Sequence, residues 1–170
     1  MALTLAFEEL LRYTDEERTK WRRFFAEHTG ALELPMQPTG RFGTIGKLVD
    51  HIFLVERRHL QRLRAEPPSN STGLTGNNAP PLFDYGASVR RELEQFVGQL
   101  GDDDASEVRT FEVREQQWPM TPRKLLFHIL VHEIRHWAQI AVVVRQNDLA
   151  PPGEHDLVFS KSFGPLVKKV

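Results

Sequence analysis

Hydrophobic residues recur at intervals of three and four along four long segments of the chain, at residues 3–28, 44–65, 83–100 and 121–147. This spacing places apolar side chains on one face of an α-helix and is typical of helices that pack against a core. Between the third and fourth segments, residues 108–113 (VRTFEV) alternate between apolar and polar types instead. That alternation predicts a short strand or an extended crossover.

The pattern therefore predicts an all-α fold: a four-helix bundle with long crossover connections and a short β segment near residues 107–114. The alternative is a mixed α+β domain in which residues 107–118 form a β-hairpin. Two helix starts have local signals, because Thr44 is a typical N-cap and Thr121 is an N-cap followed by Pro122.

The first helix is expected to bury one apolar face, made of Phe7, Leu10, Leu11, Trp21, Phe24 and Phe25. Its charged residues, among them Glu16, Arg18 and Arg22, are expected on the opposite, polar side. A basic run on the second helix is interpreted as a solvated face, made of Arg57, Arg58, Arg62 and Arg64.

The second and fourth segments resemble each other. TIGKLVDHIFLVERRH at 44–59 aligns without gaps on TPRKLLFHILVHEIRH at 121–136, so that His51, for example, falls on His128. This internal repeat predicts that the two helices are equivalent members of a pseudo-twofold bundle. Chance similarity between two amphipathic helices is the alternative.

The composition narrows the possible functions. A length of 170 residues suits one domain spanning residues 1–170, and the formal net charge of -1 gives no global field that would attract nucleic acid or an anionic membrane. The absence of cysteine excludes disulfides, thiolate metal sites and a cysteine nucleophile. The N-terminal sequence lacks the features of a signal peptide, and no apolar run is long enough to cross a bilayer. We therefore expect a cytoplasmic protein with neither a membrane nor nucleic acid as a partner.

Histidines mark the candidate site. His128, His132 and His136 recur every fourth residue, so they form one stripe on the fourth helix, surrounded by apolar residues. Their buried ring nitrogens need partners, and a divalent metal satisfies that need, with His51 on the equivalent helix as a further ligand. The repeat by itself pairs His51 with His128. The alternative is that each histidine bonds to a carbonyl or carboxylate in the core.

Residues 132–136 also match H-E-x-x-H, the zincin motif in which the glutamate acts as general base. Zincins need a neighbouring sheet and a further downstream ligand, and the only later histidine is His155 in a tail rich in proline and glycine. A metalloprotease is therefore disfavoured. Glu133 is turned about 100° from His132 around the helix, and we interpret it as a surface residue or as one that supports the ligands.

The sequence resembles the DinB/YfiT-like family of metal-dependent enzymes over nearly its whole length. The matching pieces are TIGKLVDHI in the second helix, LLFHILVHEIRHWAQI in the fourth and RQNDLAPPGEHD in the tail. Members typically have a histidine on the second helix and an H-x-x-x-H pair on the last core helix. The resemblance thus implies His51, His132 and His136 as metal ligands, with His128 as a supporting or core residue.

The resemblance also implies a function. Gln139 keeps its family position, but Trp137 and Ala138 replace the usual arginine and glycine, so no role is carried over for that arginine. The metal is expected to be zinc or nickel, with iron or manganese as alternatives, because imidazole binds all of these. We expect a hydrolase or a thiol-dependent S-transferase acting on a small molecule. A low-molecular-weight thiol is one candidate partner, and a homodimer is compatible with this function. A non-catalytic metal-binding bundle in a stress response is the alternative.

Overall fold

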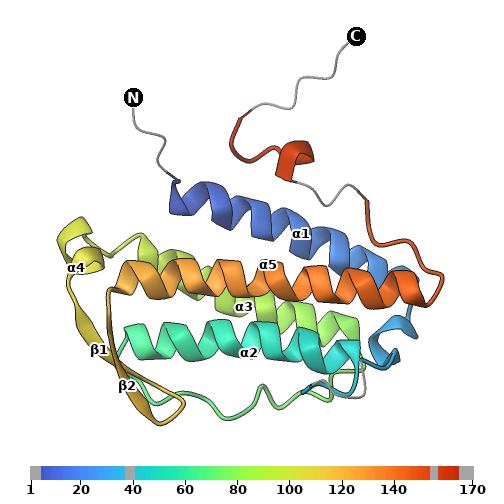
Figure 1. The fold of residues 1–170 in the computed structure, drawn as a ribbon, viewed down its shortest axis with the longest axis horizontal. Helices are drawn as coiled ribbons and strands as arrows, with labels where there is room; N and C mark the ends of the chain where they lie inside the picture. The colour runs from blue at the N-terminus through green and yellow to red at the C-terminus, as the bar shows by residue number, and fades with distance from the viewer. Residues whose placement is uncertain (1–4, 37–40, 154–156, 165–170) are drawn as a thin grey trace.

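A computed structural model describes residues 5–36, 41–153 and 157–164. Its body consists of four long helices that lie side by side (Figure 1), namely α1 (Phe7–Glu27), α2 (Ile45–Leu63), α3 (Ala79–Val97) and α5 (Pro122–Gln146). The predicted helical-bundle fold is confirmed. None of the helices in the described part of the chain is long and apolar enough to cross a membrane.

Short elements connect the long helices, namely η1 (Ala31–Glu33), α4 (Asp102–Ser106), β1 (Arg109–Val113), β2 (Gln116–Met120) and η2 (Leu157–Phe159). The expected β segment exists, and β1 pairs with β2 as an antiparallel hairpin. The bundle and the hairpin were treated as alternatives, but they coexist because the hairpin forms within the crossover between α3 and α5. The short helix α4 lies between α3 and β1.

The helix N-termini follow local sequence signals. The backbone N–H of Lys47 donates to Thr44 Oγ1 at 3.3 Å, and that of Lys124 donates to Thr121 Oγ1 at 3.1 Å, so both predicted caps form. The predicted start of α3 near residue 83 was wrong, because the helix begins at Ala79 with prolines in its first turn. Proline is tolerated there, since the first N–H groups of a helix have no intrahelical acceptor.

The middle of the bundle contains a buried ionic cluster in which each long helix supplies one charge. Arg18 of α1 and Arg90 of α3 both contact Glu56 of α2 and Glu133 of α5. Arg18 Nε donates to Glu133 Oε1 at 2.7 Å, and Arg90 Nε donates to Glu56 Oε1 at 2.9 Å. All four side chains are at least nine-tenths buried. Two positive and two negative charges therefore neutralise one another inside the protein.

This cluster corrects two predictions. Arg18 was expected on the polar side of the first helix, and Glu133 was interpreted as a surface or supporting residue, but both lie in the core. Burial alone would raise the pKa of Glu133, but Arg18 and then Arg90 outweigh it and hold the pKa below its ordinary value. The charges are stable in the core because each one has a counter-charge.

We expect Glu133→Gln to lower the free energy of unfolding by about 3 kcal/mol or more, because it leaves one buried arginine charge without its counter-charge. Urea denaturation followed by circular dichroism measures the change. The matched control is Glu27→Gln on the exposed end of α1, which should shift the stability by less than about 0.5 kcal/mol. Equal stability of the two variants would contradict the proposed importance of the cluster.

Candidate metal centre

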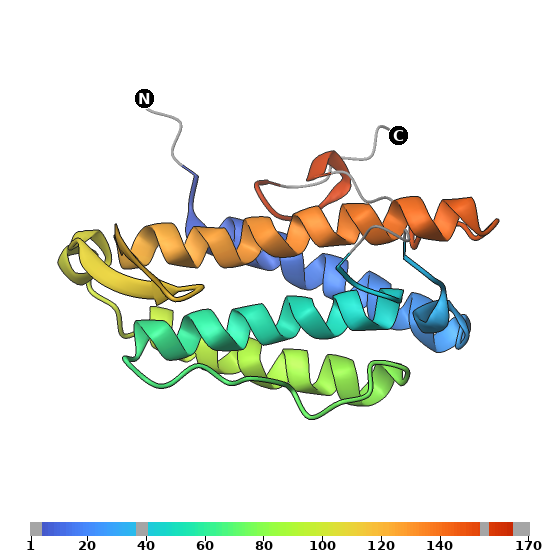
Figure 2. The same cartoon turned by 60° about the horizontal axis from the view of Figure 1, so that its bottom comes forward.

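A groove of about 470 Å³ lies between α2 and α5, which run in opposite directions. Each helix presents one face to it, with His51, Val55, Arg58, His59 and Arg62 from α2 and His128, Val131, His132, Arg135, His136 and Gln139 from α5. The loop before α2 borders it through Arg41 and Phe42, and the hairpin tip borders it through Val113 and Arg114. Figure 2 shows this hairpin lying across the space between α2 and α5, with its tip pointing towards the middle of the bundle.

Three histidines meet at the wall of this groove. One ring nitrogen from each of His51, His132 and His136 lies within 4.8 Å of the other two. His132 Nε2 and His136 Nε2 are 3.0 Å apart, and the ring centroid of His51 is 5.1 Å from that of His132. One divalent ion about 2.1 Å from each nitrogen fits between donors at such separations.

Hydrogen bonding orients one of these rings. His136 Nδ1 lies 2.7 Å from Gln139 Oε1, an oxygen that can only accept, so we assign the proton to Nδ1. The lone pair of Nε2 then points towards His132, whose Nε2 is within contact distance. Two imidazole lone pairs that converge in this way repel each other unless a proton or a metal cation lies between them.

The electrostatic environment keeps the candidate ligands neutral. Burial, followed by the proximity of His136, lowers the pKa of His51 to about 4, and burial lowers the pKa of His132 to about 2. Burial also lowers the pKa of His136, although the bond to Gln139 partly offsets this. Neutral imidazole is the form that binds metals, so the donor set fits the expected divalent ion.

Two further histidines extend the stripe along the groove. His59 is buried and His128 is exposed, and their ring centroids are 5.2 Å apart. The ring centroids of His51 and His136 are 5.3 Å apart. The sequence repeat relates this pair to the pair of His59 and His128. The repeat by itself relates His51 to His128, but because α2 and α5 are antiparallel, His51 lies beside His136 and His128 lies beside His59.

The H-E-x-x-H match has a different explanation. Glu133 Oε1 accepts from Arg18 Nε and from Trp137 Nε1, and Glu133 Oε2 accepts from Arg90 Nη2. The carboxylate is therefore engaged in the core and does not line the groove, where a general base of a protease would be needed. His155, the only downstream histidine, lies outside the described residues.

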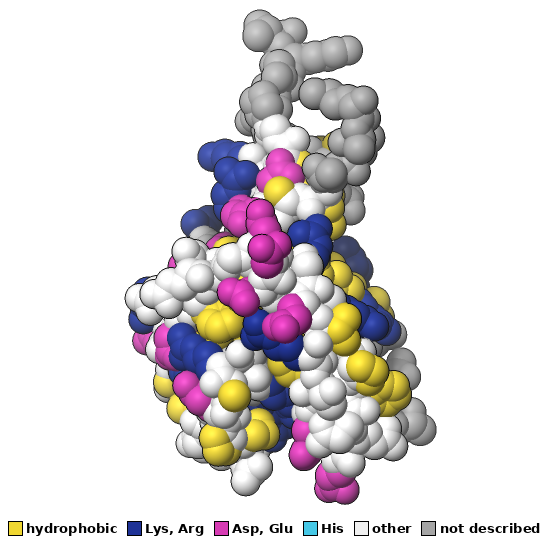
Figure 3. Space-filling model, turned by 90° about the vertical axis from the view of Figure 1, so that its left-hand side faces the viewer, with side chains coloured by type: hydrophobic (Ala, Val, Ile, Leu, Met, Phe, Trp, Pro, Cys, Tyr) yellow, Lys and Arg dark blue, Asp and Glu magenta, His cyan; other side chains and the backbone are white. Residues whose placement is uncertain are grey.

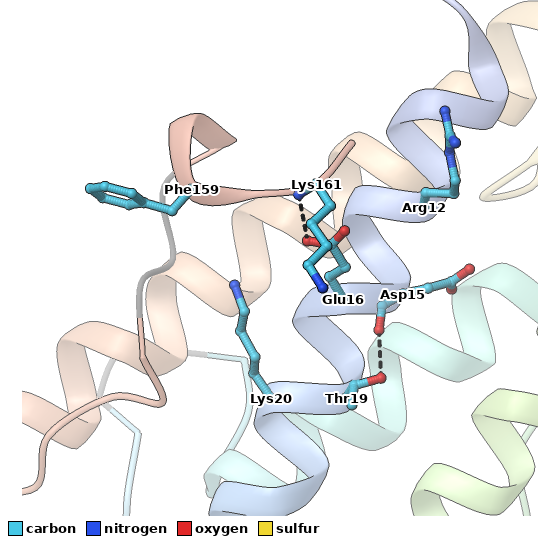
Figure 4. A pocket seen from close by; sticks show the side chains of 7 residues that line it. All are labelled: Arg12, Asp15, Glu16, Thr19, Lys20, Phe159 and Lys161. Carbon is cyan, nitrogen blue, oxygen red and sulfur yellow. Dashed lines mark hydrogen bonds between the residues drawn. The ribbon is translucent and has the colours of Figure 1, made fainter. Parts of the chain in front are cut away.

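A somewhat larger cavity, of about 550 Å³, lies on the outer side of α1, where the segment 157–164 passes over the helix. Figure 4 shows its lining, which consists of Arg12, Asp15, Glu16, Thr19, Lys20, Phe159 and Lys161. Charges of both signs are mixed here, and the N–H of Lys161 donates to Glu16 Oε2 at 3.4 Å. Because histidines are absent from these described lining residues, we assign the candidate site to the groove.

Comparison with known proteins gives the context of this site. A DinB-like protein from Bacillus cereus ATCC 10987 superimposes with a TM-score of 0.61 at 19% identity, covering 81% of this chain and 90% of its own. YjoA, a DinB-like protein from Bacillus subtilis, gives 0.61 at 19%, covering 88% of this chain and 96% of its own. These likenesses concern the fold, and no curated protein matches the sequence. The family model of the DinB family matches residues 1–161, and the chain therefore belongs to the DinB family.

Proposed function

We propose that this protein is a metal-dependent enzyme that acts on a small molecule, as a hydrolase or as a thiol-dependent S-transferase. The observation that carries the proposal is the convergence of three imidazole nitrogens within 4.8 Å at the wall of a groove of about 470 Å³. Three histidine ligands leave coordination positions free, which is usual for catalytic rather than structural metals. A groove of this volume suits a small molecule.

His51, His132 and His136 would hold the divalent ion, which would supply Lewis acidity to a bound water molecule or thiol. Residues of the chain prepare the site for such a reactant. Phe42 covers one edge, with its ring 4.6 Å from that of His51, and so limits access of bulk water. His128 is exposed in the groove with its ring 5.7 Å from that of His132, which suits it to accept a proton from the reactant.

The choice between the two reactions depends on the nucleophile. The chain has no cysteine, so any thiolate at the site must come from a second substrate. A hydrolase needs only water, whereas an S-transferase also needs room for a thiol beside the acceptor molecule. The groove extends from Phe42 past the three histidines to Val113, which supports a site that holds more than a water molecule.

Metal titration of histidine variants tests the ligand set. We expect alanine at His51, His132 or His136 to abolish stoichiometric zinc binding, because two imidazoles hold the ion far more weakly than three. Alanine at His59 should leave binding intact, and alanine at His128 should weaken it by at most about 10–100-fold, as for a residue that only supports a ligand. Calorimetry on metal-free protein measures the affinities. Complete loss at His128 with retention at His132 would instead favour a site centred on the second histidine pair.

The pH dependence of zinc binding follows from the lowered histidine pKa values. Because the pKa of His51 is lowered to about 4 and that of His132 to about 2, both remain neutral and available well below pH 7. Zinc affinity should therefore change little between about pH 8 and about pH 6 and should fall steeply only below about pH 5, where protons begin to compete. Affinity that already declines between pH 8 and pH 7 would contradict the neutral state of the site.

Cobalt substitution separates the candidate reactions. Thiolate bound to Co²⁺ gives a ligand-to-metal charge-transfer band, and in this cysteine-free chain such a band can arise only from added thiol. An S-transferase should develop the band on titration with a low-molecular-weight thiol, and His132→Ala should not. Absence of the band together with ester hydrolysis would favour a hydrolase. Absence of both, with four protein ligands at the metal, would favour the non-catalytic bundle.

A further inference from the structure

The groove beside the three histidines is strongly basic. Five arginines line it, namely Arg41, Arg58, Arg62, Arg114 and Arg135, and no aspartate or glutamate is among its described lining residues. The chain as a whole has a net charge of -1, and at the end of the bundle that bears α4 and the hairpin, acidic and basic side chains are interspersed (Figure 3). The excess of positive charge is therefore a local property of the groove.

Two of these arginines are held in place by neutral groups. Arg58 Nε donates to the backbone oxygen of Ser69 at 2.7 Å and its Nη2 to that of Asn70 at 2.9 Å, while Arg62 Nε donates to that of Glu112 at 2.6 Å. Burial, followed by the charge of Arg58, lowers the pKa of Arg62, and the more weakly acting carboxylate of Glu112 does not reverse the shift. Carbonyl oxygens orient both guanidinium groups but leave their charge uncompensated.

The other two arginines of the basic run, Arg57 and Arg64, are paired with a carboxylate. Arg57 Nη2 lies 2.6 Å from Glu92 Oε1, and Arg64 Nη1 lies 3.1 Å from Glu92 Oε2. Within the described ranges, none of the five groove arginines has such an ion pair. Interpretation of the whole basic run as a solvated face was therefore wrong: Arg57 and Arg64 share an ion pair with Glu92 of α3, and Arg58 and Arg62 line the groove.

The hairpin tip contributes its arginine at a conformational cost. Arg114 and Glu115 form the two-residue turn, with φ of 54° and 61°. Asparagine and glycine are the residues that favour this left-handed conformation, and other residues adopt it at a cost of about 1 kcal/mol each. The turn sequence thus does not optimise the turn itself. This turn places Arg114 at the wall of the groove, which Arg41 and Arg58 also line.

We propose that the substrate is a small molecule that carries a carboxylate or phosphate group, and that Arg58, Arg62 and Arg114 hold this oxyanion while the reacting end of the molecule faces the three histidines. The proposal rests on the function proposed above and names its substrate class. Guanidinium groups match the geometry of such oxyanions, and their bonds are strongest where no competing carboxylate is present. The enclosed groove and the overall negative charge of the chain favour a small anion over a nucleic acid.

Calorimetric titration with defined probes tests this assignment. Glutarate and phenyl phosphate represent the two oxyanions, and dimethyl glutarate is the uncharged counterpart of the first. Zinc-loaded and metal-free protein are each titrated in Tris buffer at low ionic strength, because sulfonate buffers and salt compete for the same arginines. We expect saturable binding of at least one anion to both forms, with a dissociation constant of about 1 mM or tighter, and no saturable binding of the diester.

Substitutions locate the binding. Arg58→Gln and Arg114→Asn should each weaken binding about five- to tenfold, also in metal-free protein, since each removes one charge-assisted hydrogen bond. Asparagine suits the left-handed turn, so Arg114→Asn preserves the hairpin. The matched controls are Glu115→Asn at the adjacent turn position and Arg64→Gln, which removes a charge from α2 outside the groove. Both should bind the anion as the wild type does.

The outcomes distinguish the two proposals. Stoichiometric zinc binding without anion binding, equal binding of the diester, or wild-type anion affinity in both arginine variants would overturn the substrate assignment alone. Arginine-dependent anion binding to a protein that fails to bind zinc would support this assignment while overturning the metal-dependent function. Anion binding that occurs only in zinc-loaded protein would mean that the metal, rather than the arginines, holds the anion, and this too would overturn the assignment.

Discussion

The mutual neutralisation of Arg18, Glu56, Arg90 and Glu133 is the constraint on which the rest of the architecture depends. Each charge comes from a different long helix, and each lies where that helix passes the middle of the bundle. An unpaired charge there would be costly, so every helix must be rotated to point its charged residue inwards. With Glu56 and Glu133 directed inwards, the adjacent faces of α2 and α5, which carry the histidines, line the groove between the two helices.

The ionic cluster also explains why both copies of the sequence repeat carry a glutamate at the same position. Glu56 and Glu133 occupy equivalent positions in the repeat and equivalent places in the ionic cluster. The histidine pairs related by the repeat have ring separations of 5.3 and 5.2 Å, which agrees with a pseudo-twofold axis between α2 and α5. Among the groove histidines, the twofold symmetry is broken at one position, because Val55 of α2 stands where α5 has His132. One end of the groove therefore gathers three imidazoles and the other only two.

Sequence periodicity predicted the elements that depend on local interactions. The spacing of apolar residues gave the four helices, and threonine followed by a helical pattern gave two of their starts. The histidine stripe and the family resemblance identified the three residues that the fold brings together, although the spacing alone left the choice between His128 and His132 open. The helices and their starts could be predicted because each depends on residues within one or two turns of the same helix, whereas the placement of His51 beside His132 and His136 was implied by the family resemblance.

The charged core could not be predicted in this way, since periodicity assigns charged residues to the outside. Arg18 becomes a core residue only through partners on three other helices. A signal was nevertheless present, because Glu56 interrupts the apolar stripe between Ile52 and Leu60, and the repeat places Glu133 in the same setting. Periodicity also could not predict which arginines of the basic run face the groove. The carboxylate that pairs with Arg57 and Arg64 belongs to Glu92 on another helix, α3.

The hairpin borders the groove without contributing a residue to the ionic cluster of the bundle. Phe111 anchors its strand β1 in the core, and the bond from Arg62 to the carbonyl of Glu112 ties the same strand to α2. Beyond these anchors, its tip adds only Val113 and Arg114 to the groove. The ionic cluster and the three histidines depend on the helices alone, so residues at the tip can change without disturbing either. The hairpin tip is therefore a non-helical element beside the groove that, under the proposed substrate assignment, can alter which molecule binds with little effect on the fold.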